Sequence, residues 1–239
     1  AVFRVQYLGE EGGRLHGALV LNLARTDCVV DWTKIRGQRI ATIFQDPMTS
    51  LNPIMTIGKQ ITSVIMKHQN VSEIEARKRA IVLMKKVGIP NAENRFDDYP
   101  FQYSGGMRQR IVIAIALSCQ PKILICDEPT TALDVTVQAQ ILQLLRKIHA
   151  EANTSILFIS HDLNVVKEIC QKVIVMYQGK IEQSAPPTQM YTQPVSKFAA
   201  TFIGHYNVLP MEVFKKLTGR DEDAKDVAFR PEVVEISTE

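Results

Sequence analysis

An apolar run that ends in two adjacent carboxylates constrains this chain more than any other stretch. Residues 123–134 have the sequence ILICDEPTTALD, which places Asp127 and Glu128 directly after four apolar residues and Asp134 six residues after Glu128. The run predicts a buried strand that delivers both carboxylates to its carboxyl end. Because buried carboxylates are costly unless a cation compensates them, we predict Asp127 as a Mg²⁺ ligand and Glu128 as a general base for an attacking water. A solvated loop after a strand is the competing interpretation of the pair by itself.

Composition excludes several classes of protein. The 239 residues suffice for a real core, and 46% hydrophobic with 22% charged residues is typical of a globular protein. A net charge of +3 is too small to argue for nucleic-acid binding. The sequence contains no signal peptide and no uninterrupted run of about 18 apolar residues, so any membrane role is expected to be peripheral. The four cysteines lack C-x-x-C spacing and are predicted to be reduced thiols.

Strand and helix patterns alternate along the chain, which predicts a three-layer α/β core. Ser72 with Glu75 has the form of a capping box, and Gly88 supplies a helix stop. The pattern predicts that this α/β core is formed by residues 1–52 and 119–190, with a helical subdomain over 53–118 and a small C-terminal extension over 191–239. Strands are predicted at 39–44, 122–127 and 155–160, a hairpin at 172–183, and helices at 104–117 and from 134 onwards.

Three further polar segments follow or begin predicted elements. Ser104, Gly105 and Gly106 open a helix, whose free N–H groups suit an anion, although an ordinary helix cap is an equal alternative. His161 follows an apolar strand, where imidazole can bond a phosphate or position a water, although a structural role is more common. Gln45 also follows a buried strand, and its amide can reach a metal or a water.

Together, in this order and spacing, these segments resemble the ATP-binding cassette (ABC) ATPases of membrane transporters. Gln45 matches the family's Q-loop, residues 103–107 (YSGGM) its signature loop, and residues 123–128 its Walker B strand. Residues 132–134 match the D-loop, and His161 matches the switch histidine. The resemblance covers roughly residues 35–195. Within the family, the sequence is most similar to the oligopeptide, dipeptide and nickel importer branch.

The resemblance implies a P-loop NTPase-like (RecA-like) fold and an ATPase that uses ATP and Mg²⁺. Glu128, His161 and Gln45 would be catalytic, Asp127 and Gln45 would meet the metal, and the ATP of a facing cassette would contact Ser104, Gly105, Gly106 and Asp134. The implied partners are a second cassette, transmembrane permease subunits and, indirectly, a solute-binding protein, without nucleic acid. The implied location is peripheral, on the cytoplasmic face of the cell membrane.

The family's phosphate loop, G-x-x-x-x-G-K-[S/T], occurs nowhere in the sequence. Two placements of the N-terminal part stay open. In the first, residues 2–7 and 18–23 form the family's first two strands and the loop is deleted before Cys28, which makes Tyr7 a candidate for stacking on adenine. In the second, the chain begins after the lost loop, and residues 12–21 belong to the strand that leads into the Q-loop. Without the loop, phosphate affinity is expected to collapse, so the alternative function is a degenerate cassette that caps or regulates a competent partner.

The C-terminal part departs from the peptide-importer pattern. No cysteine follows Cys170, and residues 200–210 and 227–232 resemble the small β regulatory extension of polyamine and sugar importers. A cassette ATPase of DNA repair or translation is disfavoured, because the chain has no long coiled-coil insertion and no tandem second cassette. Met107 replaces the usual signature glutamine, a variation associated with the importer branch named above.

Overall fold

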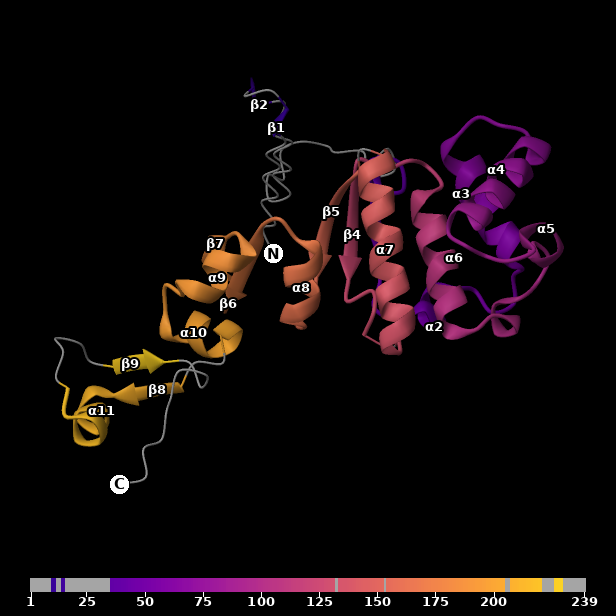
Figure 1. Cartoon of the computed structure of the whole chain (residues 1–239). Coiled ribbons are helices and arrows are strands. Elements are labelled where there is room, and N and C mark those ends of the chain that lie inside the picture. The colour runs from indigo at the N-terminus through magenta and orange to yellow at the C-terminus, as the bar shows by residue number, and fades with distance from the viewer. Residues whose placement is uncertain are drawn as a thin grey trace. The chain divides into compact units, whose positions relative to one another are not determined.

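The protein is described by a computed structural model that forms two compact units, Ala1–His161 and Asp162–Glu239 (Figure 1). The residues described are 10–11, 14–15, 35–131, 133–152, 154–204, 207–220 and 226–229. The predicted N-terminal strands at 2–7 and 18–23, and the candidate Tyr7, lie outside these ranges. The predicted domain boundaries remain a prediction.

A parallel three-stranded sheet forms the centre of the first unit, with strand order β3-β4-β5. Its strands are β3 (Ile40–Ile43), β4 (Ile123–Asp127) and β5 (Ser155–Ile159). Ile43 pairs with Cys126, and Asp127 pairs with Ile159, so all three strands end at the same edge. The predicted strands are therefore confirmed to within one or two residues at each end. Glu10–Glu11 (β1) pairs antiparallel with Arg14–Leu15 (β2) as a separate two-stranded sheet.

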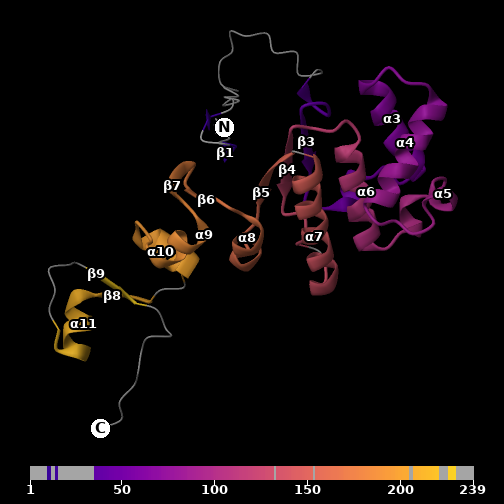
Figure 2. The same cartoon turned by 45° about the horizontal axis from the view of Figure 1, so that its top comes forward.

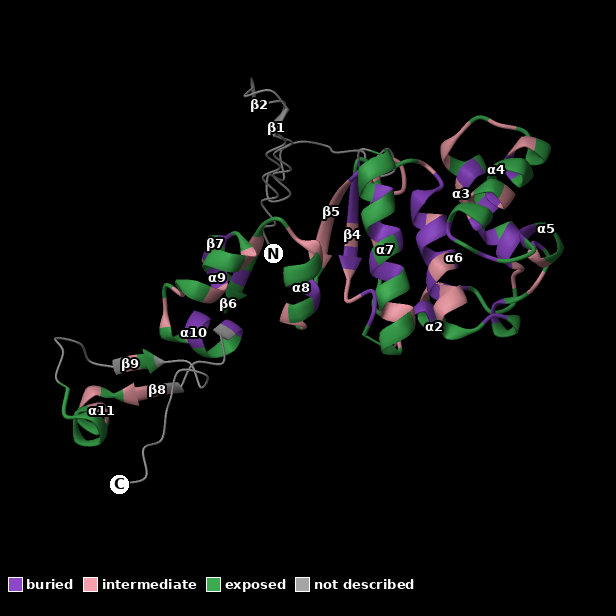
Figure 3. Cartoon of the chain, viewed as in Figure 1, coloured by how far each residue is buried: buried purple, intermediate pink, exposed green. Residues whose placement is uncertain are grey.

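Helices fill the chain between β3 and β4, as the sequence predicts. Ser72 caps α4 by accepting a hydrogen bond from the Glu75 amide, and Gly88, at a φ of +82°, ends that helix. Fully buried isoleucine and methionine side chains on α3, α4 and α6 make a common core, visible as purple ribbon in Figure 3. The elements are α2 (Pro47–Ser50), α3 (Ile57–His68), α4 (Glu73–Lys86), α5 (Ala92–Arg95), η1 (Pro100–Gln102) and α6 (Gly105–Leu117).

Helix α7 (Val135–Ala152) follows the carboxylate strand and runs beside β4 in both Figure 1 and Figure 2. Asp134 accepts a hydrogen bond from the Val137 amide at 2.9 Å and so satisfies the first turn of the helix. One face of α7 is apolar and buried, formed by Ile141, Leu142, Leu144, Leu145 and Ile148. This face fixes α7 in the core and places Asp134 at the end of the loop that leaves β4.

The second unit is built around a hairpin of β6 (Val173–Tyr177) and β7 (Lys180–Ala185). Gln178 and Gly179, with φ angles of +48° and +76°, make the predicted turn, as a two-residue hairpin loop requires. A small core holds Val175, Met190 and Ile203. The remaining elements are α8 (Leu163–Ile169), α9 (Pro187–Thr192), α10 (Lys197–Gly204), β8 (Asn207–Pro210), α11 (Met211–Thr218) and β9 (Asp226–Phe229), with β8 paired antiparallel to β9.

Candidate functional site

The carboxyl edge of the parallel sheet brings three predicted catalytic side chains together. Gln45, which follows β3, donates a hydrogen bond from Nε2 to Oε2 of Glu128 at 2.8 Å. His161, which follows β5, places Nδ1 2.9 Å from Oε1 of the same carboxylate. The three residues lie far apart in the sequence and meet because parallel strands in this sheet end side by side. Glu128 is thus the centre of the site.

The backbone at Glu128 is held in an uncommon conformation. Its φ angle is +45°, in the left-handed region that non-glycine residues rarely occupy. The Glu128 amide donates to the carbonyl of Ile159 at 3.0 Å, which fastens the residue to the end of β5. Such strained residues cluster at sites where a side chain must be aimed in a direction that regular structure does not allow. Here the strain turns the carboxylate toward Gln45 and His161.

The hydrogen bonds around Glu128 favour its ionised form. The bond from His161 contributes most to a lowered pKa of the Glu128 carboxyl, and the bond from the Thr131 hydroxyl, at 3.0 Å to Oε2, adds to it. Because an ionised carboxylate only accepts hydrogen bonds, the proton between His161 and Glu128 belongs to Nδ1. The Glu128 side chain is 24% exposed and that of His161 is 68% exposed, so solvent and a ligand can reach both.

Asp127 is the last residue of β4 and is partly exposed at the same edge of the sheet. No group of three or more His, Cys, Asp and Glu side chains within the described ranges is arranged to enclose a metal ion. Mg²⁺ needs no such cage, because it keeps several waters and is held by one or two protein oxygens together with substrate phosphates. The donor chemistry of Asp127, with the amide oxygen of Gln45, therefore fits Mg²⁺ brought in with a nucleotide.

The predicted signature residues lie at the start of α6, separate from the Glu128 cluster. Ser104 caps the helix by accepting a hydrogen bond from the Met107 amide at 3.4 Å, and Gly105 is exposed with open space around it. Gly106 faces α7, where a Cβ atom on it would lie 2.5 Å from Cγ1 of Val137. The structure thus joins Gly106 to the first turn of the helix that Asp134 caps.

Two arginines of the signature segment donate hydrogen bonds to backbone carbonyls of the same chain. Arg108 donates from Nε to the Pro100 carbonyl at 2.7 Å, and Arg110 donates from Nη1 to the Val87 carbonyl at 2.6 Å. Burial also lowers the pKa of the Arg110 guanidinium. These contacts tie α6 to η1 and to the end of α4.

Sequence reasoning missed Thr131, the third partner of Glu128. Its hydroxyl reaches Oε2 because residues 128–131 form a turn, with the Thr131 amide donating to the Glu128 carbonyl at 3.3 Å. A threonine three residues after a carboxylate in a loop is the available signal, since that spacing suits a turn. The contact makes the loop after Glu128 part of the site.

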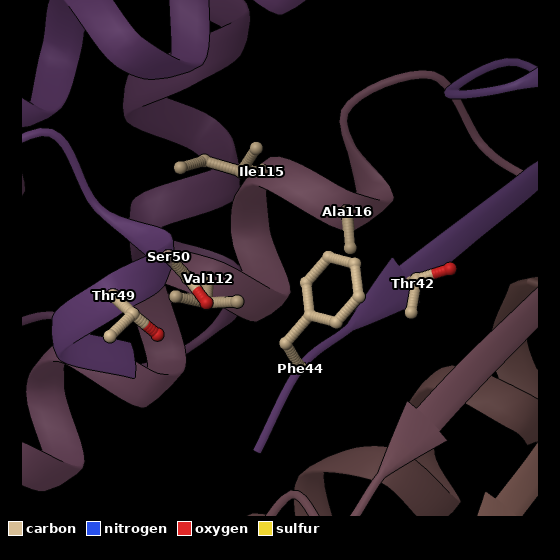
Figure 4. Close-up of a pocket in the computed structure, with 7 residues that line it drawn as sticks. All are labelled: Thr42, Phe44, Thr49, Ser50, Val112, Ile115 and Ala116. Atoms are coloured by element: carbon tan, nitrogen blue, oxygen red, sulfur yellow. The ribbon is translucent and has the colours of Figure 1, made fainter. Parts of the chain in front are cut away.

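A hollow in the described part of the first unit is lined by neither Glu128 nor its hydrogen-bond partners. It has a volume of about 520 Å³ and opens between the end of β3 and α6, with Phe44 beside it (Figure 4). The seven lining residues are Thr42, Phe44, Thr49, Ser50, Val112, Ile115 and Ala116. None of them carries a charged side chain.

Comparison with known proteins identifies the family of this arrangement. A family model described as "ABC transporter" matches residues 13–131. The solved dimer of the ATP-binding cassette MJ0796 in a post-hydrolysis state, bound to ADP and Pi, is 31% identical with a TM-score of 0.59, and the match covers 67% of this chain and 68% of that one. The chain belongs to the ABC transporter family. The predicted α/β, P-loop NTPase-like fold class is thereby confirmed.

Relatives of this ABC chain also confirm the predicted branch. It is 61% identical over 164 residues to the oligopeptide transport ATP-binding protein AmiE of Streptococcus pneumoniae, which covers 69% of this chain and 46% of AmiE. It is 50% identical over 185 residues to the oligopeptide transport ATP-binding protein AppD of Bacillus subtilis, covering 77% of this chain and 56% of AppD. The chain spans about half the length of these curated relatives.

A helix that spans a membrane must be both long and apolar. Within the ranges given above, no helix combines the length and the apolar character needed to cross a bilayer.

Proposed function

We propose that this chain forms part of the ATP-binding subunit of a peptide-importing ABC system. Its similarity to oligopeptide transport ATP-binding proteins supports a peptide-like solute. In this proposal the chain acts peripherally at the cytoplasmic face of the membrane, pairs with a second cassette and contacts transmembrane permease subunits, which receive solute from a binding protein. The observation that carries the proposal is the ionised Glu128 held between Gln45, Thr131 and His161.

Glu128 is proposed as the general base of ATP hydrolysis. A carboxylate that stays ionised can accept a proton from a water and aim that water at a terminal phosphate. Its three hydrogen bonds hold the carboxylate in one orientation, so little rearrangement is needed when a water binds beside it. The same bonds lower the pKa of Glu128 and so favour its unprotonated form.

His161 and Gln45 are proposed to position the reacting groups. With Nδ1 donating to Glu128, the second ring nitrogen of His161 is directed away from the carboxylate, on a side chain that is 68% exposed, and can meet the γ-phosphate. Gln45 keeps its amide oxygen for a metal or a water. Asp127 and Gln45 would hold Mg²⁺, which supplies neutralisation of phosphate charge when it is bound.

The signature segment is proposed to serve the nucleotide of the facing cassette. Ser104, Gly105 and Gly106 begin a helix of 13 residues, whose first N–H groups and partial positive charge suit a phosphate. Asp134, at the start of α7, is joined to this segment through Gly106 and Val137. Tyr7 remains the candidate for stacking on adenine.

A degenerate cassette is the second candidate function. The sequence has no G-x-x-x-x-G-K-[S/T] loop in its 239 residues, and that loop supplies most of the phosphate contacts in such enzymes. In this alternative the chain presents its signature residues to a competent partner and does not hydrolyse ATP itself.

Nucleotide binding and turnover separate the two candidates. ATP affinity by calorimetry and phosphate release are measured for the chain by itself and mixed with a competent cassette of the same transporter type. Turnover that disappears in Glu128→Gln but persists in Glu73→Gln, an exposed carboxylate on α4, supports a hydrolytic subunit. Turnover of the mixture that is unaffected by Glu128→Gln supports the degenerate cassette, and no binding or turnover in either sample rejects both.

A further inference from the structure

Gln109 is a buried polar side chain that the proposed chemistry does not use. It lies in the second turn of α6 and is 1% exposed. Its Nε2 donates a hydrogen bond of 2.8 Å to the carbonyl of Pro129, twenty residues further along the chain. Pro129 directly follows Glu128, so this bond connects the signature helix to the loop that leaves the carboxylate strand.

The chemistry of the pair fixes how the amide is oriented. A carbonyl only accepts hydrogen bonds, so the NH₂ group of Gln109 must face Pro129. Its Oε1 then has no hydrogen-bond partner, one of two such buried side-chain atoms in the described part of the chain. Burying an unpaired carbonyl lowers stability, whereas a methionine of similar size would leave no polar atom unpaired on that side chain. Methionine would, however, remove the bond to the buried Pro129 carbonyl, so stability by itself does not decide between the two side chains.

The bond from Gln109 is one of three contacts that hold α6 against the segment after β4. The second is the close approach of Gly106 to Val137, and the third is a 2.9 Å bond from Nη2 of Arg110 to Oε1 of Gln140. The last two contacts reach α7. Of the three, only that of Gln109 reaches the loop between Glu128 and Asp134.

That loop determines where the carboxylate of Glu128 lies. Thr130 is 6% exposed, and Thr131 donates its hydroxyl to Oε2 of Glu128. Because Pro129 stands between Glu128 and Thr131 in a tight turn, a shift of its carbonyl moves both ends of this hydrogen bond. Holding Pro129 therefore holds the geometry of the site.

We propose that Gln109 is a positioning residue that couples the signature end of α6 to the loop that follows Glu128. Its bond to Pro129 keeps the signature end of α6 and the loop of Glu128 in one fixed relation. This rests on the proposed function, in which Ser104 would contact a facing cassette's ATP while Glu128 acts on this cassette's own. A displacement at the signature residues would then reach Glu128 through Gln109.

Hydrogen exchange of single amides tests the coupling without nucleotide. In Gln109→Met the amides of Thr131 and Leu133, which bond within the loop, should exchange about five-fold faster, the effect of one lost buried hydrogen bond. The amide of Ile113, inside α6, should be unchanged. Gln143→Met, the same substitution at an exposed position of α7, is the matched control and should change none of them.

Two outcomes would overturn the proposal: unchanged exchange at Thr131 and Leu133, or equal acceleration throughout α6 and β4, which marks a purely structural residue. If Gln109→Met does not fold, Gln109→Asn withdraws the amide by one methylene and is expected to give the same local acceleration. With a partner cassette whose own catalytic carboxylate is replaced by glutamine, kcat should fall about five-fold while the KM for ATP is unchanged. If no cassette mixture turns over ATP, the proposed function fails, whereas the exchange result still decides the role of Gln109.

Discussion

Gly106 offers the sharpest test of how the signature helix packs on α7. Built onto Gly106, a Cβ atom would lie 2.5 Å from Cγ1 of Val137, 3.5 Å from Cγ2 and 3.6 Å from Cβ. Non-bonded carbon atoms prefer separations of about 3.5–4.0 Å, so Gly106→Ala must displace Val137 or separate the two helices. Gly105, the preceding residue, has no atom within 4 Å of its built Cβ. The two glycines therefore lie in the same helix, but only Gly106 is packed closely against Val137.

The two substitutions are expected to change the stability of the fold in opposite directions. Replacing Gly105 by alanine should stabilise the fold by about 0.4–1 kcal/mol, because alanine restricts the unfolded chain. The same gain applies at Gly106 but is opposed by an overpacking cost of about 1–3 kcal/mol. We therefore expect Gly106→Ala to be destabilised by about 1.3 kcal/mol relative to the wild type, and by no more than about 2.6 kcal/mol. The separation between the two variants should be larger still.

Urea unfolding followed by circular dichroism measures both variants, and a double-mutant cycle with Val137→Ala identifies the clash. Val137→Ala removes both methyl groups that the new Cβ would meet, so it should recover most of the loss in the Gly106→Ala background. In the wild type the same change should cost stability, because Val137 is partly buried. Equal stability of the two alanine variants, or no recovery by Val137→Ala, would refute the packing argument.

Three other predictions concern separate parts of the structure. Because hydrogen bonds lower the pKa of Glu128, its carboxylate stabilises the fold at neutral pH and loses that contribution as pH falls through the lowered pKa. The difference in Tm between wild type and Glu128→Gln should therefore shrink in acid, and a constant difference would contradict it. Gln178→Asn should raise stability by about 0.5 kcal/mol in urea unfolding, because asparagine tolerates the positive φ of the turn before Gly179, and a loss would count against the turn. Tyr103→Phe should cost about 1 kcal/mol, since the buried hydroxyl bonds the Arg95 carbonyl at 2.6 Å; an unchanged midpoint would show that this bond contributes nothing.

The elements that the sequence predicts best are those set by local pattern. The strand before Glu128 follows from a short apolar run, and the hairpin turn follows from Gln178 and Gly179. The cap at Ser72 was confirmed, because its side chain needs only the amide three residues later. Such signals lie within a few residues of one another.

The missed features depend on contacts between distant segments. Nothing near Gln109 in the sequence indicates Pro129 as its partner, and nothing near Gly106 indicates Val137. The partner of Arg108 is equally hidden in the sequence, because the carbonyl that it meets belongs to Pro100 in η1. The cluster at Glu128 was predicted as a group from the family resemblance, and the structure explains it, because the ends of its parallel strands meet at one edge.

The central claim is that Glu128 is the base that activates water for ATP hydrolysis. The most direct measurement is the steady-state rate of phosphate release at saturating ATP for wild type, Glu128→Gln and Glu73→Gln, each mixed with a partner cassette whose own catalytic carboxylate is replaced by glutamine. We predict that kcat falls by about 10²–10⁴-fold in Glu128→Gln, the usual contribution of a general base. The KM for ATP and the rate of Glu73→Gln should stay near wild type. An unchanged kcat in Glu128→Gln would contradict the assignment.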